Sequence, residues 1–234
     1  VIAQHAEQDH SGSIPVVLNK YPAAKVITSE KGKGMLQDHL GIPADKIIIL
    51  KDGETLSLGD KSIKIIYTPW VHWPETFCTY VPEDKILFSC DFFGSHLATS
   101  DLFITDKSRV YEAAKRYYAE IMMPFRNIIE KNIDKILKYD FDMIAPSHGP
   151  IYNEPDFIIN AYKDWISDDI KNLVLIPYIS MHGSTRLMVE YLVSSLLVKN
   201  IEVRQFDLSV TDLGKLAISL VDAATLIIGT PTVH

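Results

Sequence analysis

Four side chains that can bind a metal ion lie within six residues near the start of the sequence. The segment His5-Ala6-Glu7-Gln8-Asp9-His10 offers two imidazoles and two carboxylates, which are common donors for first-row transition metals. On a loop after a strand, this alternation can direct several side chains at one centre. Short clusters of acidic residues and histidines also occur on solvated loops, so this segment alone leaves both interpretations open.

Three further donors each follow an apolar run that has the composition of a buried strand. His72 comes after 63–68, Asp91 after 86–89 and His148 after 143–145. Loops at the carboxyl ends of neighbouring strands gather around a common site. The sequence therefore predicts that these donors and the first cluster form one metal centre.

Other polar residues in this part of the chain have a functional and a packing interpretation. His96 lies near Asp91 in the sequence, and Tyr117 and Tyr118 lie on a helix that could cover the centre. Each of the three is a candidate for a role beside the metal ligands, and core packing is the alternative. His39 is expected to be solvated at a helix end. Cys78 and Cys90 have no Cys-x-x-Cys partner, which favours small buried thiols over metal ligands.

The predicted elements that position these residues follow two patterns along the chain. In the first, over residues 25–166, strands and helices occur without a strict alternation. Apolar runs rich in Ile and Val predict strands, and amphipathic runs predict helices, of which the first has Ser29 as N-cap and Gly41 at its end. The residues between 52 and 60 have the composition of a hairpin turn. The predicted strands are 25–28, 46–50, 63–68, 77–81, 86–89 and 143–145, and the predicted helices are 29–40, 108–119, 125–139 and 156–166.

From residue 173 the pattern becomes a strict alternation of strand and helix. Strands 173–178, 203–206 and 225–228 alternate with helices 184–199 and 213–220. This βαβαβ order predicts a parallel, doubly wound sheet. The polar stretch 167–172 is the expected boundary, so we expect one domain over 1–170 and a second over 171–234.

The loop after strand 173–178 has the composition of a phosphate site. Ser180-Met181-His182-Gly183-Ser184-Thr185 puts hydroxyls and free backbone N–H groups at the start of a helix, and Gly183 permits a close backbone approach. The loop matches neither Gly-x-x-x-x-Gly-Lys-Ser/Thr nor Gly-x-Gly-x-x-Gly. Without further information, a capped helix start explains it equally well.

Taken together, these motifs resemble those of the flavodiiron proteins. The resemblance is carried by His-x-Glu-x-Asp-His at 5–10, His-Trp-Pro at 72–74, Asp91 and Ser-His-Gly at 147–149, and it extends over 80–89 and 143–149. It covers essentially the whole chain. The resemblance implies an α/β protein: a metallo-β-lactamase-like αββα sandwich followed by a doubly wound flavodoxin-like domain.

The resemblance also implies a ligand set for two iron ions. His5, Glu7 and His72 would hold one iron, Asp9 and His148 the other, and Asp91 would bridge them. His10 occupies a position that in this family can bind metal or stand aside. Zinc hydrolases of this fold have a histidine where this chain has Glu7, and a carboxylate there favours iron.

For the second domain the resemblance implies FMN. The loop 180–185 is similar to a flavodoxin FMN-phosphate loop, although His182 replaces an aromatic residue common there. Thr230, Pro231 and Thr232 are similar to the next flavin loop. The implied activity is reduction of oxygen to water, or of nitric oxide to nitrous oxide, by a cytoplasmic enzyme. Its electrons would pass through FMN from rubredoxin or a similar carrier, within a head-to-tail homodimer.

Composition sets limits that agree with this interpretation. The 234 residues carry a formal charge of −7, and no run of Lys and Arg offers phosphate contacts, so we expect no nucleic-acid partner. No apolar stretch reaches the roughly 18 residues of a membrane span, and no signal peptide is visible. Two alternatives remain open: a dizinc hydrolase of the same fold, and a non-enzymatic redox or oxygen sensor.

The length is short for the family that the chain resembles. Its metal domain takes roughly 250 residues and a flavodoxin-like domain roughly 150. The sequence has no initiator Met, and it ends just after a strand enters a loop. We therefore expect a chain truncated at both ends, with every core iron ligand but only part of the flavin site.

Overall fold

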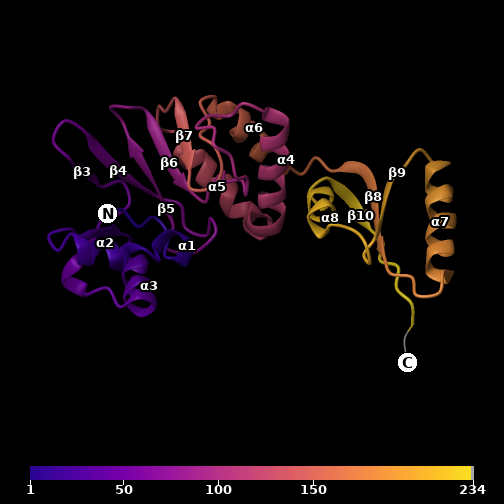
Figure 1. Ribbon diagram of the computed structural model, residues 1–234. Coiled ribbons are helices and arrows are strands. Elements are labelled where there is room, and N and C mark those ends of the chain that lie inside the picture. The colour runs from indigo at the N-terminus through magenta and orange to yellow at the C-terminus, as the bar shows by residue number, and fades with distance from the viewer. Residues whose placement is uncertain (233–234) are drawn as a thin grey trace.

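The computed structural model describes residues 1–232, which form three β-sheets flanked by helices (Figure 1). Two of the sheets lie within residues 1–166. The third is built from residues 171–226, next to helix α4 in Figure 1.

The outer layer of the first part is a small parallel sheet covered by helices. Strands β1 (Val26–Thr28) and β2 (Ile47–Ile49) pair in parallel, and residues 1–3 extend this sheet beside β1. Helix α3 (Glu30–Leu40) starts at Ser29, whose side chain accepts from the Gly32 N–H, and ends at Gly41 in the left-handed region. These caps confirm the helix predicted from residue 29. The other short elements here are α1 (Gln8–Ser11), α2 (Ile14–Lys20) and a 3₁₀ turn (Ala44–Lys46).

The central sheet has five strands in chain order. They are β3 (Thr55–Ser57), β4 (Ser62–Tyr67), β5 (Phe77–Val81), β6 (Ile86–Cys90) and β7 (Met143–Pro146). Neighbours are antiparallel except β6 and β7, which are parallel. Consequently β4, β6 and β7 run in the same direction, and their carboxyl ends lie at one edge of the sheet.

Helices cover the far face of this sheet, and the order of the layers follows from the core contacts. Ile66, Leu87 and Ile144 belong to a core shared with α4 (Lys107–Tyr117), α5 (Arg126–Ile136) and α6 (Pro155–Trp165). On the other face, Ile65 and Phe77 pack with Ile27 and Leu50 of the small sheet. The layers are therefore helix, sheet, sheet and helix, as predicted.

The structure corrects three details of the predicted elements. The predicted helix 108–119 ends as α-helix at Tyr117 and continues as a π-helical turn, Tyr118–Met122, and a 3₁₀ turn, Met123–Phe125. The predicted helix 125–139 ends at Ile136. Asp9 and His10, expected on a loop, lie in the single turn of α1.

The third sheet is parallel, in the order β10 (Ala223–Leu226), β8 (Lys171–Tyr178), β9 (Glu202–Asp207). Helices α7 (Ser184–Leu197) and α8 (Leu213–Leu220) connect the strands and flank the sheet in Figure 1. The first strand lies in the middle, as in doubly wound sheets. The predicted βαβαβ alternation is confirmed.

Candidate metal centre

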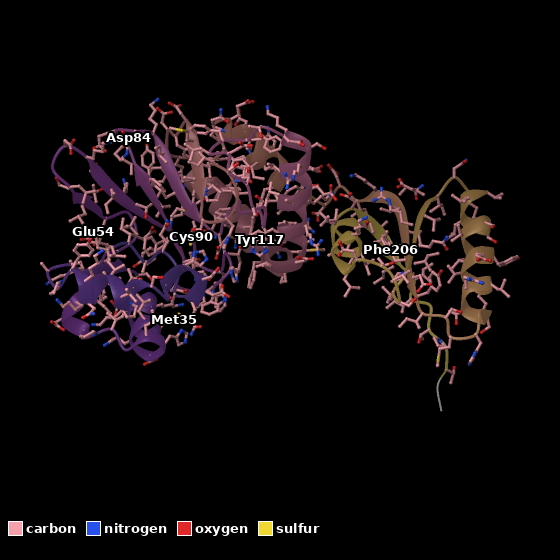
Figure 2. The ribbon with its side chains drawn as sticks, in the orientation of Figure 1. Met35, Glu54, Asp84, Cys90, Tyr117 and Phe206 are labelled. Carbon is pink, nitrogen blue, oxygen red and sulfur yellow. The ribbon has the colours of Figure 1, made fainter. Side chains whose placement is uncertain are left out.

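The predicted donors meet at the edge where β4, β6 and β7 end. His72 lies in the loop after β4, Asp91 directly follows β6, and His148 follows β7. His5 follows the segment beside β1, where the Ala3 N–H donates to Ile27 O at 2.8 Å. In Figure 2, Cys90 at the end of β6 lies between the central sheet and the helices of the outer layer.

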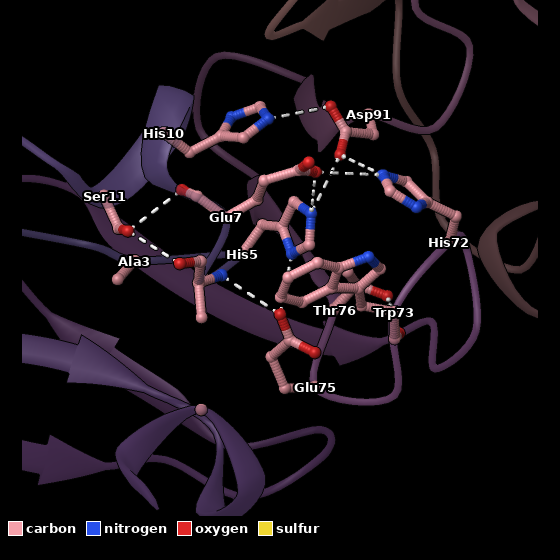
Figure 3. Close-up of polar contacts among 12 residues, drawn as sticks. Ala3, His5, Glu7, His10, Ser11, His72, Trp73, Glu75, Thr76 and Asp91 are labelled. Carbon is pink, nitrogen blue, oxygen red and sulfur yellow. Dashed lines mark hydrogen bonds and ion pairs between the residues drawn. The ribbon is translucent and has the colours of Figure 1, made fainter. Parts of the chain in front are cut away.

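One group of donors contains His5, Glu7, His72 and Asp91 (Figure 3). His5 Nε2 lies 3.1 Å from Glu7 Oε2 and 3.3 Å from Asp91 Oδ2. His72 Nε2 lies 3.4 Å from Glu7 Oε2 and 3.3 Å from Asp91 Oδ2. Two imidazoles and a terminal carboxylate around one point are the ligand set of many non-haem ferrous sites.

The second group uses the other oxygen of Asp91. His10 Nε2 lies 3.0 Å and His148 Nε2 3.3 Å from Asp91 Oδ1. Asp9 Oδ2 lies 3.3 Å from His148 Nε2 and 3.4 Å from His10 Nε2. Asp91 thus faces both groups with one oxygen each, which is the arrangement of a carboxylate between two metal ions. His10 points into the second group with its Nε2.

The electrostatics of the centre follow from this crowding. Burial raises the pKa of Asp91, but the imidazoles of His10, His148 and His72 outweigh it and hold the pKa far below its usual range. For His10 and His72, burial lowers the pKa and nearby Asp91 raises it, with a net rise. Asp91 is also the main cause of the raised pKa of His148. A cationic ligand at this place would replace the protons on the histidines.

The buried polar atoms of the centre also fit a metal. Both carboxylate oxygens of Asp91 and Nε2 of His10 are buried and make no hydrogen bond of good geometry. Buried polar atoms without hydrogen bonds are rare in folded proteins and call for an explanation such as an ion. Metal ligation supplies one for all three atoms.

The backbone around the ligands is strained. Trp70, Cys90 and Phe93 have positive φ values of 63°, 57° and 67°, which are unfavourable for residues with a side chain. Each lies within two residues of His72 or Asp91. Such conformations persist where the surrounding structure enforces them, and they concentrate at functional sites.

Two glycines allow the ligand loops to pack closely. Gly149 follows His148 with φ 89°, and a Cβ there would lie 2.1 Å from Ser95 Oγ. A Cβ on Gly94 would lie 3.0 Å from Asp91 O and 3.5 Å from His148 Cβ. The glycine of the Ser-His-Gly motif is therefore required by both backbone conformation and space.

Of the three candidates for a role beside the metal donors, the structure places two next to the centre and one in the helical layer. His96 is exposed, and its ring centroid lies 4.7 Å from that of Tyr117 and 5.1 Å from that of His148. Tyr117 is buried, which raises its pKa and keeps its hydroxyl protonated. Tyr118 instead packs on Tyr162 and Trp165 in the helical layer, so only His96 and Tyr117 adjoin the centre.

The surroundings of the remaining candidates agree with the roles predicted for them without a metal. His39 is exposed, as expected. Cys78 and Cys90 are buried free thiols. Burial raises the pKa of Cys78 to about 12 and, together with the Asp91 charge, the pKa of Cys90 well above its usual range. Although Cys90 lies within reach of His10 and Asp91, its protonated form is a poor metal ligand.

Sequence reasoning missed Glu75. Its Oε1 lies 2.6 Å from His5 Nδ1 and accepts the Ala6 N–H at 3.0 Å (Figure 3). Burial raises the pKa of Glu75, but the hydrogen bonds from His5 and Ala6 outweigh it and lower the pKa. The sequence offered one signal for Glu75. It is a carboxylate three residues after His72, a predicted metal donor, and it comes just before the predicted strand 77–81.

Beside a small cavity of about 140 Å³ lined by His5, His10 and Cys90, two larger cavities adjoin the centre. One of about 420 Å³ is lined by Gln8, His39, Trp73 and the carboxylate donors Glu7 and Asp9. The other, of about 460 Å³, has His96 and Tyr117 in its wall beside charged residues of α4. A small molecule can reach the ligands through the first.

The two predicted flavin loops lie side by side. The Ile179 N–H donates to Gly229 O at 3.0 Å, and a Cβ on Gly229 would lie 2.8 Å from Tyr178 Cβ and 3.3 Å from Thr185 Cγ2. Gly183 is left-handed at φ 85°, and Ser180 Oγ accepts the Arg186 N–H at 3.2 Å. The side chains of Met181, His182, Ser184, Thr230 and Thr232 are exposed at this end of the sheet, and Pro231 is half-buried.

Comparison with known proteins gives both sequence and structural relatives. A family model described as "ODP family beta lactamase" matches residues 1–149. A nitric oxide reductase of Moorella thermoacetica is 36% identical over 239 residues, and a coenzyme F420H₂ oxidase of Methanothermobacter marburgensis is 31% identical over 241 residues. Both alignments cover 100% of this chain and 60% of the relative, so the chain spans about three fifths of these curated relatives.

Solved structures match the fold closely. The rubredoxin:oxygen oxidoreductase of Desulfovibrio gigas has a TM-score of 0.95 at 28% identity, over 100% of this chain and 60% of that one. The flavodiiron protein of Giardia intestinalis has a TM-score of 0.94 at 29% identity, over 100% of this chain and 58% of that one. The resemblance to these proteins therefore extends along the whole chain.

Proposed function

The chain belongs to the ODP family of β-lactamase-like proteins, in agreement with its predicted resemblance to flavodiiron proteins, and from this premise we propose that it contributes the diiron centre of an oxidoreductase. The proposed reaction is reduction of oxygen to water, nitric oxide to nitrous oxide, or both. The observation that carries the proposal is Asp91, whose two carboxylate oxygens face two separate groups of donors.

In this proposal each side chain has a defined part. His5, Glu7 and His72 would hold one iron, Asp9 and His148 would hold the other with His10 beside them, and Asp91 would lie between the two. An iron pair bound there would supply electrons for the reduction of a diatomic gas. Glu7 and Asp9 line the open cavity, which gives a small molecule a route to the ligands. His96 and Tyr117 lie beside His148, where they can orient water or a bound molecule.

A dizinc hydrolase of the same fold is the main alternative. The carboxylate at Glu7 and the oxidoreductase names of the relatives support iron instead. A sensor without turnover would bind the same metals, so kinetics must separate the sensor from the enzyme.

We propose FMN as the second cofactor, held by a flavodoxin-like domain to which residues 171–234 belong. Two loops converge for this purpose: 180–185 at the start of α7, and 230–232 after β10. Hydroxyls and backbone N–H groups at a helix start suit a phosphate, and the close approach of Gly229 to Thr185 brings the second loop next to the first. FMN would pass electrons to the iron pair.

The wider setting is also a proposal. We expect rubredoxin or a similar carrier as electron donor, a head-to-tail homodimer, and a cytoplasmic location. One relative is named a rubredoxin:oxygen oxidoreductase, which supports a carrier of this kind. No helix within residues 1–232 is long and apolar enough to cross a membrane.

The test uses the full-length protein, purified without oxygen and analysed for metal and flavin. We expect two irons and one FMN per chain. The reduced protein is then mixed with oxygen or nitric oxide in a single turnover. At least one of the two gases should reoxidise the protein faster than the same gas reoxidises free reduced flavin. Two zincs without flavin would support the hydrolase, and full loading without faster reoxidation by either gas would contradict the proposed enzyme.

A further inference from the structure

Glu75 lies behind the metal centre, against the face of His5 that points away from the other donors. Glu75 is 2% exposed, and His5 is 1% exposed. Oε1 of Glu75 lies 2.6 Å from Nδ1 of His5, whereas Nε2 of the same ring faces Glu7 and Asp91. The two nitrogens of one imidazole are thus divided between a buried carboxylate and the donor group.

This division fits a metal ligand. With an ion held between Glu7 and Asp91, Nε2 of His5 would bind it through its lone pair, and Nδ1 would carry the proton that the Glu75 carboxylate accepts. Oε1 also accepts the Ala6 N–H at 3.0 Å, which fixes Glu75 to the backbone beside its partner. Partners of this kind hold a ligand ring in place and increase its basicity.

We propose that Glu75 is a positioning residue for the first metal, holding His5 with Nε2 directed at the ion; this rests on the proposed diiron centre. Glu75 lies on the same loop as His72, the other histidine of that group. One loop therefore supplies one ligand and orients another.

The loop that carries Glu75 is itself anchored to the outer layer. The backbone carbonyl of Glu75 accepts from Ser29 Oγ at 2.8 Å, and Ser29 Oγ also accepts the Gly32 N–H at the start of α3. Thr28 Oγ1 donates to Ala3 O at 3.0 Å, two residues before His5. The end of β1 and the start of α3 therefore hold both partners in register.

The support is confined to one of the two donor groups. Within residues 1–232, His5 is the one histidine of the centre whose Nδ1 contacts a carboxylate within hydrogen-bond distance. The second group, with Asp9, His10 and His148, has no equivalent of Glu75 there. Loss of Glu75 should therefore affect one metal and leave the other.

The test compares Glu75→Gln and Glu75→Ala in the full-length protein, with Glu83→Gln as the matched control. Glu83 is an exposed carboxylate that accepts from Ser62. The glutamine can keep both hydrogen bonds of Oε1 while removing the charge, and the alanine removes both. Release of each metal to a chelator gives the first readout. The exchangeable Nδ1–H proton in the cobalt-substituted protein gives the second, by paramagnetic NMR.

We expect one metal to leave about 10–100-fold faster in Glu75→Ala and less so in Glu75→Gln, with the other metal within about twofold of wild type. One shifted, slowly exchanging ring proton should vanish in Glu75→Ala and move in Glu75→Gln. Glu83→Gln should match wild type in both readouts.

Three results would overturn the positioning role. The first is unchanged release in Glu75→Ala. The second is equal loss of both metals together with a lower melting temperature of the metal-free protein, which indicates a structural role. The third, decisive if Glu75→Ala does not fold, is a Glu75→Gln protein with wild-type release and an unmoved proton signal. A wild-type protein that binds no metal would instead contradict the proposed function.

Discussion

At the scale of single residues, Asp91 is the side chain that both donor groups share. Each of its oxygens lies within 3.3 Å of two histidine nitrogens, one pair in each group. Asp9, by contrast, contacts the second group alone. These two aspartates give a matched pair for counting metals.

We predict that Asp91→Asn loses both metals and Asp9→Asn loses one. The amide keeps the shape of the carboxylate but lacks the charge that holds two cations together. The affinity loss in Asp91→Asn should exceed the 10–100-fold typical of residues that only support ligands. Metal analysis after dialysis against graded chelator measures the count. Equal losses in the two variants would contradict a bridging position for Asp91.

Gly149 allows a second residue-scale prediction, because the chain offers as a control another glycine with positive φ. Gly41 has φ 64° with open space around its Cβ position, whereas Gly149 has φ 89° and Ser95 Oγ 2.1 Å from that position. Gly41→Ala should cost only backbone strain, about 1 kcal/mol of unfolding free energy. Gly149→Ala should cost more, roughly 2–4 kcal/mol, and shift His148.

Chemical denaturation measures the first effect, and metal content measures the second. Equal destabilisation by the two alanines, with full metal content in Gly149→Ala, would mean that Ser95 moves aside and that Gly149 does not position His148.

At the scale of elements, the predictable part of the centre is the part that the strand ends fix. His72, Asp91 and His148 could be predicted as donors, because each of them closely follows a predicted strand in the sequence. Glu75 could not be read in this way, because its partner His5 lies 70 residues earlier. Helix α1 is too short to show a period, and a π-helical turn after α4 has nearly the apolar spacing of an α-helix.

Helix α4 makes a further connection that no local pattern reveals. Its Lys115, 5% exposed, lies 2.7 Å from Asp222, which comes two residues after the end of α8. Asp222 also pairs with Lys171 at 3.1 Å. The next residue, Arg116, pairs with Asp212 at 2.9 Å at the start of α8. Two consecutive side chains of α4 therefore hold both ends of α8, and the residue after them, Tyr117, adjoins the metal centre.

We predict that Lys115→Met weakens the contact between α4 and α8. The free energy of unfolding should fall, and its dependence on pH should change. Removing Lys115 leaves Asp222 with Lys171 as its remaining partner, and loss of this hydrogen-bonded contact should cost about 1–3 kcal/mol. Burial raises the pKa of Asp222, but Lys115 and Lys171 outweigh it and lower the pKa. The stabilisation is therefore present above the carboxylate's unfolded pKa and lost as pH falls through the folded value.

We measure the unfolding free energies of wild type and Lys115→Met from pH 7 down to pH 3, and the difference between them should shrink as the pH falls. Lys107→Met is the control, because Lys107 and Glu154 form an exposed pair worth at most about 1 kcal/mol. A constant gap between wild type and Lys115→Met over this range would mean that packing, not the ion pair with Asp222, explains the loss.

At the scale of the whole molecule, the two predicted sites lie in separate sheets of one chain. The metal donors gather at the edge of the central sheet, and the predicted flavin loops lie at one end of the sheet β10-β8-β9. A head-to-tail homodimer would bring the flavin of one subunit to the irons of its partner. This arrangement predicts that two defective subunits can complement each other.

We predict that mixing an Asp91→Asn protein with a Gly183→Val protein restores activity. The first lacks metals and keeps its flavin loop, whereas the second keeps its metals and loses the left-handed turn at φ 85° that the proposed phosphate loop requires. Random reassociation makes about half of the dimers hybrid, each with one working pair, so activity should reach about a quarter of wild type. Each variant alone should be inactive, and the hybrids must first form by dissociation and reassociation, which native mass spectrometry can verify. If verified hybrids stay inactive, electrons pass within one chain, and the separation of the two sites must instead be closed by a movement between the sheets.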